Sequence, residues 1–279
     1  MNLAHADAGG SLASTPAIDV DAAQFTYADG TRALEPVSLR IAPGEFVALV
    51  GPSGCGKSTL LKMMSGLLAP SAGELRVRTD GRDGTRAKGA AIAFVFQAPT
   101  LMPWAPVHAN VRLPLDLANM PRQESRRRVD EALALVGLTE FAGALPRGLS
   151  GGMQMRASIA RGLVTHPSIL LMDEPFGALD EITRQDLDGE LLHLWTKHRF
   201  TVVFVTHSIH EAVFLSERVI VLTPRPGRIV GEVRIDEPYP RDADFTFSAN
   251  YSELARRVQH CLHRVMTSNG AQPAPAHDA

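Results

Sequence analysis

The stretch Gly51-Pro52-Ser53-Gly54-Cys55-Gly56-Lys57-Ser58 has the pattern G-x-x-x-x-G-K-S, which is typical of a loop that binds phosphate. It follows the apolar run 46–50, which suits a buried parallel strand, and precedes residues 59–64, which suit a helix. The glycines allow a tight turn that points several backbone N–H groups at one phosphate, and the helix start adds the positive end of its dipole. A glycine-rich turn that binds nothing is disfavoured, because the lysine, the serine and both flanking elements agree with the motif.

Two side chains of this loop indicate its chemistry. We expect Lys57 to reach the β- and γ-phosphates of a nucleotide, and the Ser58 hydroxyl to ligate Mg²⁺. Cys55 occupies a variable position of the motif and is expected to be a spectator thiol.

Composition limits the class of protein. The chain has 279 residues, 45% of them hydrophobic, which is enough for one large α/β domain or one domain with a small appendage. A formal net charge of -2 argues against a nucleic-acid partner. The two cysteines, Cys55 and Cys261, indicate no disulfide framework and fit a reducing cytosol. The sequence has neither an apolar run of about 18 residues, as a membrane span requires, nor a secretory signal. We therefore expect a protein that is soluble or reaches a membrane only through a partner.

A second candidate phosphate site lies in residues 149–156, Leu-Ser-Gly-Gly-Met-Gln-Met-Arg. Ser150, two glycines and a helical pattern place a hydroxyl and free N–H groups at one helix start, where they would point the same way. The alternative is a plain serine cap. A site so far along the chain from the phosphate loop is useful only if the fold, or a second copy of the chain, brings the two together.

Acidic and aromatic candidates follow or flank other predicted strands. Asp173 and Glu174 end the apolar run 169–172, where an acid would hold Mg²⁺ through water and its neighbour would act as a general base; a helix N-cap is the alternative. His207 closes the strand 201–206 and could donate a hydrogen bond to a γ-phosphate, although such a histidine taken alone is more often structural. Tyr27 could stack on adenine, but its spacing alone favours an ordinary core or edge aromatic.

Residues 97–147 interrupt the run of strands. Three prolines within 98–106 predict an irregular loop, on which Leu101, Met102 and Trp104 mark a protein contact if they are exposed, or only fix the loop if they are buried. Residues 107–147 read as helices, and two helices between strands indicate an inserted helical subdomain.

These motifs, in this order and spacing, resemble the ATP-binding subunit of an ABC transporter over residues 17–235, and LSGGM at 149–153 is the decisive element. The resemblance implies an α/β fold with a mixed sheet core, a small antiparallel β subdomain and a helical subdomain. It implies ATP and Mg²⁺ as ligands, and it reverses the preference for Tyr27 in favour of adenine stacking. The implied ATP-binding residues are Tyr27, Gly51, Ser53, Gly54, Cys55, Gly56, Lys57, Ser58 and Thr59.

The resemblance also implies roles in catalysis and in a dimer. Glu174 is the implied catalytic base, His207 the γ-phosphate switch, and Gln97 the residue that touches Mg²⁺ and senses the γ-phosphate, so that the implied metal set is Ser58, Gln97 and Asp173. In a head-to-tail homodimer, the signature residues Ser150, Gly151 and Gly152 would close on the ATP of the opposite subunit. Asp180 is the implied aspartate of the loop that crosses the dimer.

Further partners follow from the same resemblance. The chain would power transmembrane permease subunits at the cytoplasmic face of the cell membrane. Loop 97–106 and nearby helices would form the groove that receives a permease helix. An extracytoplasmic solute-binding protein would be an indirect partner. FQAPTLMPW at 96–104, DEPFGALD at 173–180 and TPRPGRIV at 223–230 look like the nitrate, sulfonate and taurine importers, a group that also imports bicarbonate, cyanate and pyrimidine precursors. Met153 and Gly177 depart from the general family pattern but remove no catalytic group.

The predicted organisation is a flexible leader at 1–16, an ABC ATPase domain at 17–235 with its helical subdomain at about 107–160, and an extension at 236–279 with one helix and a disordered tail. The alternatives are a non-transport soluble ABC ATPase, a phosphate-loop kinase and a degenerate regulatory cassette. A non-transport ABC ATPase usually carries two fused cassettes or long insertions. A phosphate-loop kinase has no use for LSGGM. A degenerate regulatory cassette would lack the catalytic residues that are present here.

Overall fold

The computed structural model describes residues 15–78, 92–177 and 179–268 of the chain. Most of the predicted leader and the predicted tail beyond 268 lie outside the described residues.

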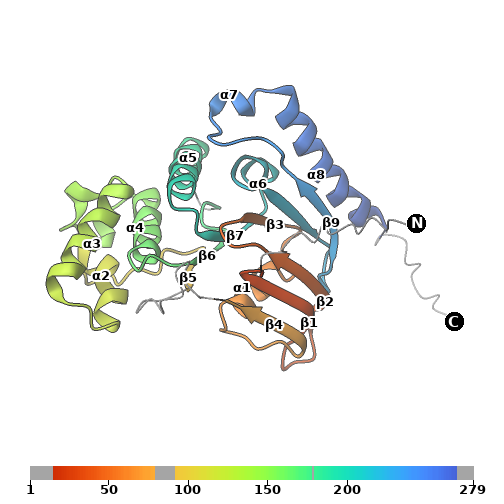
Figure 1. Ribbon diagram of the computed structural model, residues 1–279, viewed down its shortest axis with the longest axis horizontal. Helices are drawn as coiled ribbons and strands as arrows, with labels where there is room; N and C mark the ends of the chain where they lie inside the picture. The colour runs from red at the N-terminus through yellow and green to blue at the C-terminus, as the bar shows by residue number, and fades with distance from the viewer. Residues whose placement is uncertain (1–14, 79–91, 178, 269–279) are drawn as a thin grey trace, which may run out of the picture.

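The described strands form two sheets (Figure 1). In chain order the strands are β1 (Ile18–Thr26), β2 (Arg32–Ile41), β3 (Phe46–Val50), β4 (Ala72–Val77), β5 (Ile92–Val95), β6 (Ile169–Asp173), β7 (Thr201–Thr206), β8 (Arg218–Leu222) and β9 (Ile229–Arg234).

Helices connect and cover these sheets. The α-helices are α1 (Lys57–Met64), α2 (Val107–Leu117), α3 (Arg122–Leu135), α4 (Gly151–Leu163), α5 (Glu181–His198), α6 (Ile209–Leu215), α7 (Ala243–Thr246) and α8 (Ala249–Ser268). Two short 3₁₀ helices, η1 (Thr139–Phe141) and η2 (Pro146–Gly148), lie between α3 and α4.

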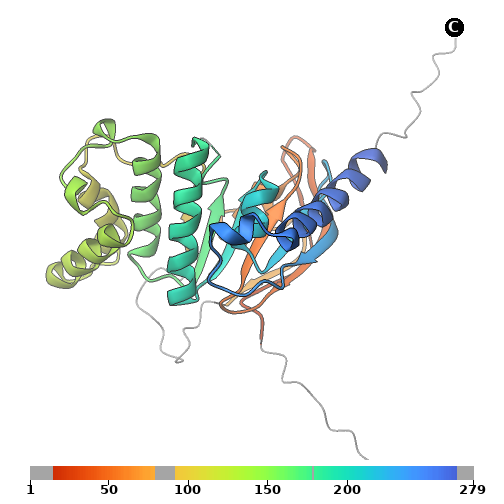
Figure 2. The same ribbon diagram turned by 90° about the horizontal axis from the view of Figure 1, so that it is seen from above.

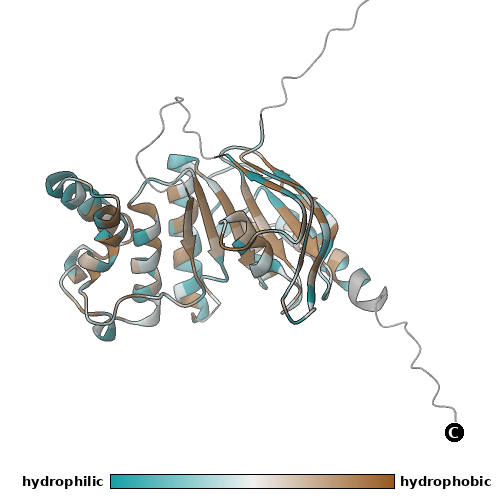
Figure 3. Ribbon diagram, turned by 90° about the horizontal axis from the view of Figure 1, so that it is seen from below, coloured by the Kyte–Doolittle hydropathy of each residue, from teal (hydrophilic) through white to brown (hydrophobic). Residues whose placement is uncertain are grey.

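The larger sheet has the strand order β5-β6-β7-β3-β8-β9. Its first five strands are parallel and β9 pairs antiparallel with β8, so the predicted mixed sheet is confirmed. Helices on both faces explain why every residue of β3 is buried and why its sequence is a continuous apolar run. The brown, hydrophobic strands at the centre of Figure 3 are this sheet.

The smaller sheet has the order β2-β1-β4 and is antiparallel throughout, which confirms the predicted antiparallel subdomain. The proline, serine and glycine within residues 70–73 favour a turn, but β4 already begins at Ala72. Gly73 explains the difference: its φ is +78°, and a Cβ on it would lie 2.1 Å from the carbonyl oxygen of Ala22 in β1. The glycine therefore continues the strand where the chains approach too closely for any side chain.

The helices divide the core into three clusters. Leu60, Leu61, Met63 and Met64 of α1 are buried between the two sheets. On the opposite face of the larger sheet, α6 and α8 pack against β3, β8 and β9 (Figure 1). The helices α2, α3 and α4 form a separate group at one end of the molecule, and α5 lies beside α4 with a roughly parallel axis (Figure 2).

The C-terminal extension differs from its prediction of one helix, because α7 precedes α8. This helix has only four residues, and the Asp242 side chain caps it by accepting a hydrogen bond from Phe245 N. A single turn is too short to show a helical period, so the sequence read it as irregular. Tyr251, Leu254 and Val258 bury the apolar face of α8 as its spacing predicted.

Within the described parts of the chain, no helix combines the length and apolar character that crossing a membrane would require.

Candidate active site

The register of the larger sheet brings three candidate segments to one edge. Val50, the last residue before the phosphate loop, lies opposite Thr206 of β7, and Asp173 of β6 lies opposite Val205. Because these strands are parallel, their carboxyl ends meet, which is where ligands of open α/β sheets bind. The phosphate loop, the acidic pair and His207 are therefore neighbours although they come from distant parts of the sequence.

Lys57 is held inside the phosphate loop. Its Nζ donates hydrogen bonds to the carbonyl oxygens of Gly51 at 2.8 Å and Pro52 at 3.0 Å, and lies 3.9 Å from Glu174 Oε1. The side chain is only 4% exposed. A buried ammonium so close to the loop supplies the positive charge that a bound phosphate needs.

Two glycines set the shape of this loop. Gly56 has φ +100°, and a Cβ there would lie 2.6 Å from Leu34 Cδ2 and 2.8 Å from the carbonyl oxygen of Ala33. A Cβ on Gly51 would lie 2.9 Å from both Cys55 Sγ and the carbonyl oxygen of Leu222. Both positions thus exclude any larger residue. Cys55 itself is buried, and burial raises the pKa of its thiol, which agrees with a protonated spectator.

Ser58 and Asp173 form a pair of oxygen donors. Ser58 Oγ donates to Asp173 Oδ1 at 2.8 Å, which joins the start of α1 to the end of β6. Burial raises the pKa of Asp173, and the hydrogen bond from Ser58 partly opposes that rise. A hydroxyl and a carboxylate fit Mg²⁺, which takes few protein ligands and keeps several waters. In the described residues no group of three or more His, Cys, Asp or Glu gathers as an all-protein metal site would.

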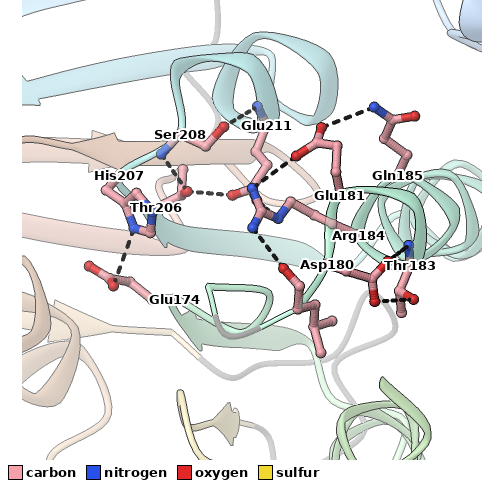
Figure 4. Close-up of polar contacts among 11 residues, drawn as sticks. Glu174, Asp180, Glu181, Thr183, Arg184, Gln185, Thr206, His207, Ser208 and Glu211 are labelled. Carbon is pink, nitrogen blue, oxygen red and sulfur yellow. Dashed lines mark hydrogen bonds and ion pairs between the residues drawn. The ribbon is translucent and has the colours of Figure 1, made fainter. Parts of the chain in front are cut away.

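Glu174 has a strained backbone that fixes its position. Its φ is +45°, which is uncommon for a residue with a side chain, and its N–H donates to the carbonyl oxygen of Val205 at 2.9 Å. Its Oε2 lies 3.5 Å from Nδ1 of His207, which is half-exposed. Figure 4 shows the two side chains pointing toward each other. The acid and the histidine thus share the space in front of the phosphate loop.

Tyr27 and Gln97 occupy the flanks of the loop. The Tyr27 hydroxyl shares a 2.8 Å hydrogen bond with Oγ1 of Thr59, while its ring is 42% exposed and meets Phe25 edge to face. Gln97 lies two residues beyond the end of β5 and is exposed. The Tyr27 ring therefore has a free face for stacking beside the loop.

The signature residues lie elsewhere. Ser150 caps α4, and its Oγ accepts a hydrogen bond from Met153 N at 3.3 Å. A Cβ on Gly152 would lie 2.6 Å from Thr183 Cγ2, so this glycine lets α4 approach the start of α5. Asp180 caps α5 and accepts from both N and Oγ1 of Thr183. The helix α4 lies beyond β6 and α5 from α1, so one chain does not bring the signature to its own phosphate loop (Figure 1).

The turn 223–228 connects β8 and β9 and packs on the phosphate loop. Arg225 Nε donates to the carbonyl oxygen of Gly54 at 3.3 Å. Gly227 donates its N–H to the carbonyl oxygen of Ala33 at 2.9 Å and lies against Cys55. The Pro-Gly pair indicated a turn, yet no signal in the sequence indicated what the turn contacts.

The loop that follows Gln97 is fixed by two residues that the sequence reasoning missed. Buried Asn110 accepts from Met102 N at 2.6 Å and donates to the carbonyl oxygen of Ala105 at 2.9 Å. Arg161 donates to the carbonyl oxygens of residues 99 and 100.

The three apolar side chains of this loop were expected either to mark a protein contact or to fix the loop, and the structure separates them. Leu101 packs against the helical core cluster and Met102 is half-buried, because Asn110 holds the loop onto α2. Trp104 is 77% exposed. Only Trp104 therefore projects freely from the loop.

A cavity of about 980 Å³ does not coincide with this site. It lies where the amino ends of the sheet meet the extension, and the ion pairs Arg218–Glu45 and Arg40–Asp19 join charges of its lining. We give the phosphate loop precedence because it gathers the reactive groups, whereas the charges named in the cavity are already paired.

Comparisons with known proteins agree with this geometry. Residues 34–177 match the family model described as ABC transporter. The chain is 45% identical over 242 residues to the taurine import ATP-binding protein TauB of Rhizobium johnstonii, covering 85% of this chain and 91% of that protein. It is 48% identical over 218 residues to the aliphatic sulfonates import ATP-binding protein SsuB 1 of Xanthomonas axonopodis pv. citri, covering 76% and 84%.

A solved structure shares the fold. The dimeric, post-hydrolysis state of the ATP-binding cassette MJ0796 bound to ADP and Pi superposes with a TM-score of 0.69 at 35% sequence identity, covering 79% of this chain and 100% of that one. Family match, relatives and structure agree on one assignment: this chain belongs to the ABC transporter family and is an ATP-binding cassette that hydrolyses ATP.

Proposed function

We propose that this chain is the ATP-hydrolysing subunit of an ABC importer that takes up a small anionic solute, an aliphatic sulfonate, taurine or nitrate, through a partner permease. The observation that carries the ATPase assignment is the meeting of Lys57, Ser58, Asp173, Glu174 and His207 at one edge of the sheet. The names of the relatives support the solute class. Another solute, such as bicarbonate or a pyrimidine precursor, and a non-transport soluble ABC ATPase are the alternatives.

The binding step uses the phosphate loop. Its backbone N–H groups and Lys57 receive the phosphates of ATP, and Tyr27 stacks on the adenine ring. Ser58 Oγ and Asp173 would hold Mg²⁺, with Gln97 reaching in from the end of β5; bound Mg²⁺ supplies positive charge that neutralises the phosphate oxygens. Lys57 changes partners in this step, from the loop carbonyls that it contacts in this structure to phosphate oxygens.

The chemical step uses Glu174 and His207. Glu174 accepts a proton from water as the water oxygen bonds to the γ-phosphorus, the bond from that phosphorus to the bridging oxygen breaks, and ADP departs with the electron pair. His207 donates a ring N–H to the γ-phosphate. The 3.5 Å between His207 Nδ1 and Glu174 Oε2 supports a joint role at one substrate.

The signature completes the site in a head-to-tail homodimer. Ser150, Gly151 and Gly152 present the start of α4, with its positive dipole end, to the ATP bound by the opposite subunit. Asp180, at the start of α5, lies on the loop that crosses between the two subunits. ATP then favours the closed pair, and hydrolysis releases it. The separation of α4 from α1 within one chain supports this arrangement.

The permease would dock where Trp104 projects, next to the groove of about 840 Å³ between α2 and α3 that His108, Arg112 and Arg126 help to line. This places the chain at the cytoplasmic face of the membrane, and a solute-binding protein would act on the same permease from the other side. Within the chain, we assign the ATPase to residues 17–235, with its helical subdomain at about 107–160, and the extension to 236–279.

A pull-down from native membranes in mild detergent tests the importer assignment. Recovery of a multi-span permease together with ATP hydrolysis by the purified protein is the expected result. A solute-binding protein recovered with the permease can then be titrated with taurine, other sulfonates, nitrate and bicarbonate. Recovery of only ribosomal or DNA-associated proteins would contradict the proposal and favour the soluble ATPase.

A further inference from the structure

We propose that Arg184, near the start of α5, is a positioning residue that couples the loop crossing the dimer to the backbone that carries His207. The inference rests on the proposed function, because it assigns a role within that ATPase site. Its observations are independent of the motif residues: a guanidinium, a buried carboxylate and a threonine form a continuous chain of contacts between the two segments (Figure 4).

The first contacts fix the dimer loop. Arg184 Nη2 donates to the carbonyl oxygen of Leu179 at 2.9 Å, and Nη1 lies 3.3 Å from Glu181 Oε2. Leu179 directly precedes Asp180, the cap of α5. The Arg184 side chain is 20% exposed and its hydrogen bond to Leu179 is partly buried, whereas the Glu181 side chain is 67% exposed. The guanidinium thus holds the point where the loop enters the helix.

The second set of contacts leads away from the loop to α6. Arg184 Nε lies 3.3 Å from Oε1 of Glu211, whose side chain is almost completely buried. The other oxygen of Glu211 accepts a hydrogen bond from Oγ1 of Thr206, the last residue of β7. One carboxylate therefore joins the arginine to the end of the strand that precedes His207.

The chain of contacts ends by enclosing His207 from both sides. Thr206 Oγ1 accepts from Ser208 N at 2.9 Å, and Ser208 Oγ accepts from Glu211 N at 3.2 Å. His207 lies between Thr206 and Ser208, and each of these two neighbours is hydrogen-bonded to Glu211, Thr206 to its carboxylate and Ser208 to its backbone N–H. A displacement of Leu179 on dimer closure would pass through Arg184 to this segment, and hence to the 3.5 Å approach of His207 to Glu174.

Charge makes the arginine necessary. Burial raises the pKa of Glu211, and Arg184 opposes that rise. Asp188, one turn further along α5, is also buried and lies in the field of both groups. Without the guanidinium, the Glu211 carboxylate would lose the cation that lies 3.3 Å from its Oε1 and would no longer be held in the geometry that Thr206 requires.

Arg128 provides a matched control. It is 22% exposed and ion-paired with Glu124 at 2.8 Å, but it lies on α3. We expect Arg184→Gln to lower kcat about tenfold or more while the affinity of one subunit for ATP changes less than about twofold. Arg184→Lys keeps the charge, but a single ammonium cannot span Leu179 and Glu211, so it should restore folding stability more than kcat. Arg128→Gln should leave both quantities close to wild type.

Two measurements separate coupling from simple support of the fold. In a Glu174→Gln background, ATP-driven dimerisation followed by size-exclusion chromatography should need several-fold more ATP with Arg184→Gln, and not with Arg128→Gln. In a double-mutant cycle, Glu211→Gln retains an acceptor for Thr206, and adding it to Arg184→Gln should lower kcat little further.

The inference is overturned if Arg184→Gln matches Arg128→Gln in kcat and in dimerisation. It is overturned as well if the fold-losses of kcat in Arg184→Gln and Glu211→Gln multiply in the double variant. It is also overturned if Arg184→Lys restores kcat as fully as it restores the melting temperature. If the wild-type protein itself does not hydrolyse ATP, or Glu174→Gln alone does not dimerise with ATP, the proposed function fails instead.

Discussion

Gly227 lies against the main chain of Cys55 so closely that a Cβ built on Gly227 would lie 1.9 Å from the Cys55 carbonyl oxygen. Gly227 is also bonded through its N–H and its carbonyl oxygen to Ala33 and Glu35. The phosphate loop is therefore clamped between β2 and a turn that follows the rest of the active site in the chain. Its shape depends on residues that its own motif does not contain.

Gly227→Ala should consequently weaken ATP binding by about tenfold or more, because the added methyl must displace the loop or the turn. Gly189→Ala is the control, since nothing lies within 4 Å of a Cβ at that position and alanine favours the interior of α5. Titration with a fluorescent ATP analogue and thermal melting measure both variants. Unchanged affinity in Gly227→Ala would show that the clamp is not required.

Glu174→Gln should retain ATP binding and hold the dimer closed, while hydrolysis slows by about 10²–10⁴-fold because the general base is lost. Single-turnover hydrolysis and size-exclusion chromatography with ATP measure the two effects. Glu140→Gln, at an exposed position of η1, is the control and should hydrolyse normally. Turnover near the wild-type rate in Glu174→Gln would refute the assignment of the base.

Chelation with EDTA should abolish hydrolysis, and Ser58→Ala should raise the Mg²⁺ concentration needed for half-maximal rate by about tenfold or more. The reason is that Ser58 Oγ and Asp173, 2.8 Å apart, are the proposed protein donors. Ser65→Ala, whose hydroxyl donates to the Lys62 carbonyl at the other end of α1, serves as control. An identical Mg²⁺ dependence in both serine variants would remove Ser58 from the metal site.

Asp188→Asn should flatten the dependence of folding stability on pH. Burial raises the pKa of Asp188 well above its ordinary value of 3.8. A carboxyl whose pKa is higher in the folded state binds its proton more tightly there, so its contribution is complete below pH 3.8 and is lost as pH rises through the folded-state pKa. Burial also raises the pKa of Glu211, which therefore acts in the same direction, so the variant should retain part of the slope.

Urea unfolding at a series of pH values above 4 measures this slope. Asp186→Asn, two residues away and exposed, should leave it unchanged. A slope in Asp188→Asn as steep as in the wild type would contradict the prediction.

Trp104→Ala should reduce recovery of the permease several-fold while the isolated protein hydrolyses ATP at the wild-type rate, because the side chain is 77% exposed and makes none of the contacts of the candidate active site. Phe247→Ala removes an equally exposed aromatic ring, 87% exposed, from the C-terminal extension. Co-purification from membranes should distinguish the two. Equal recovery with both variants would exclude Trp104 from the docking surface.

The sequence by itself determined the elements whose signals are local. The phosphate loop carries its glycines, lysine and serine in one run of eight residues, preceded by a continuous apolar run that suits a buried strand and followed by residues that suit a helix. Asp173, Glu174 and His207 were identifiable because each follows a buried apolar strand, and parallel strands end at a common edge. Ser150 was identifiable because it precedes two glycines and a helical pattern, and the structure places it at the N-cap of α4.

Only the tertiary structure decided which distant residues support those elements. The contact of Gly227 with Cys55, the hold of Asn110 on the loop before α2, and the path from Arg184 through Glu211 to Thr206 join segments whose spacing obeys no helix or strand period. The one-turn helix α7 was missed because four residues cannot display a period. Local patterns report what a segment forms and which of its faces is apolar, whereas the partner of a buried polar group is set by the packing of the whole chain.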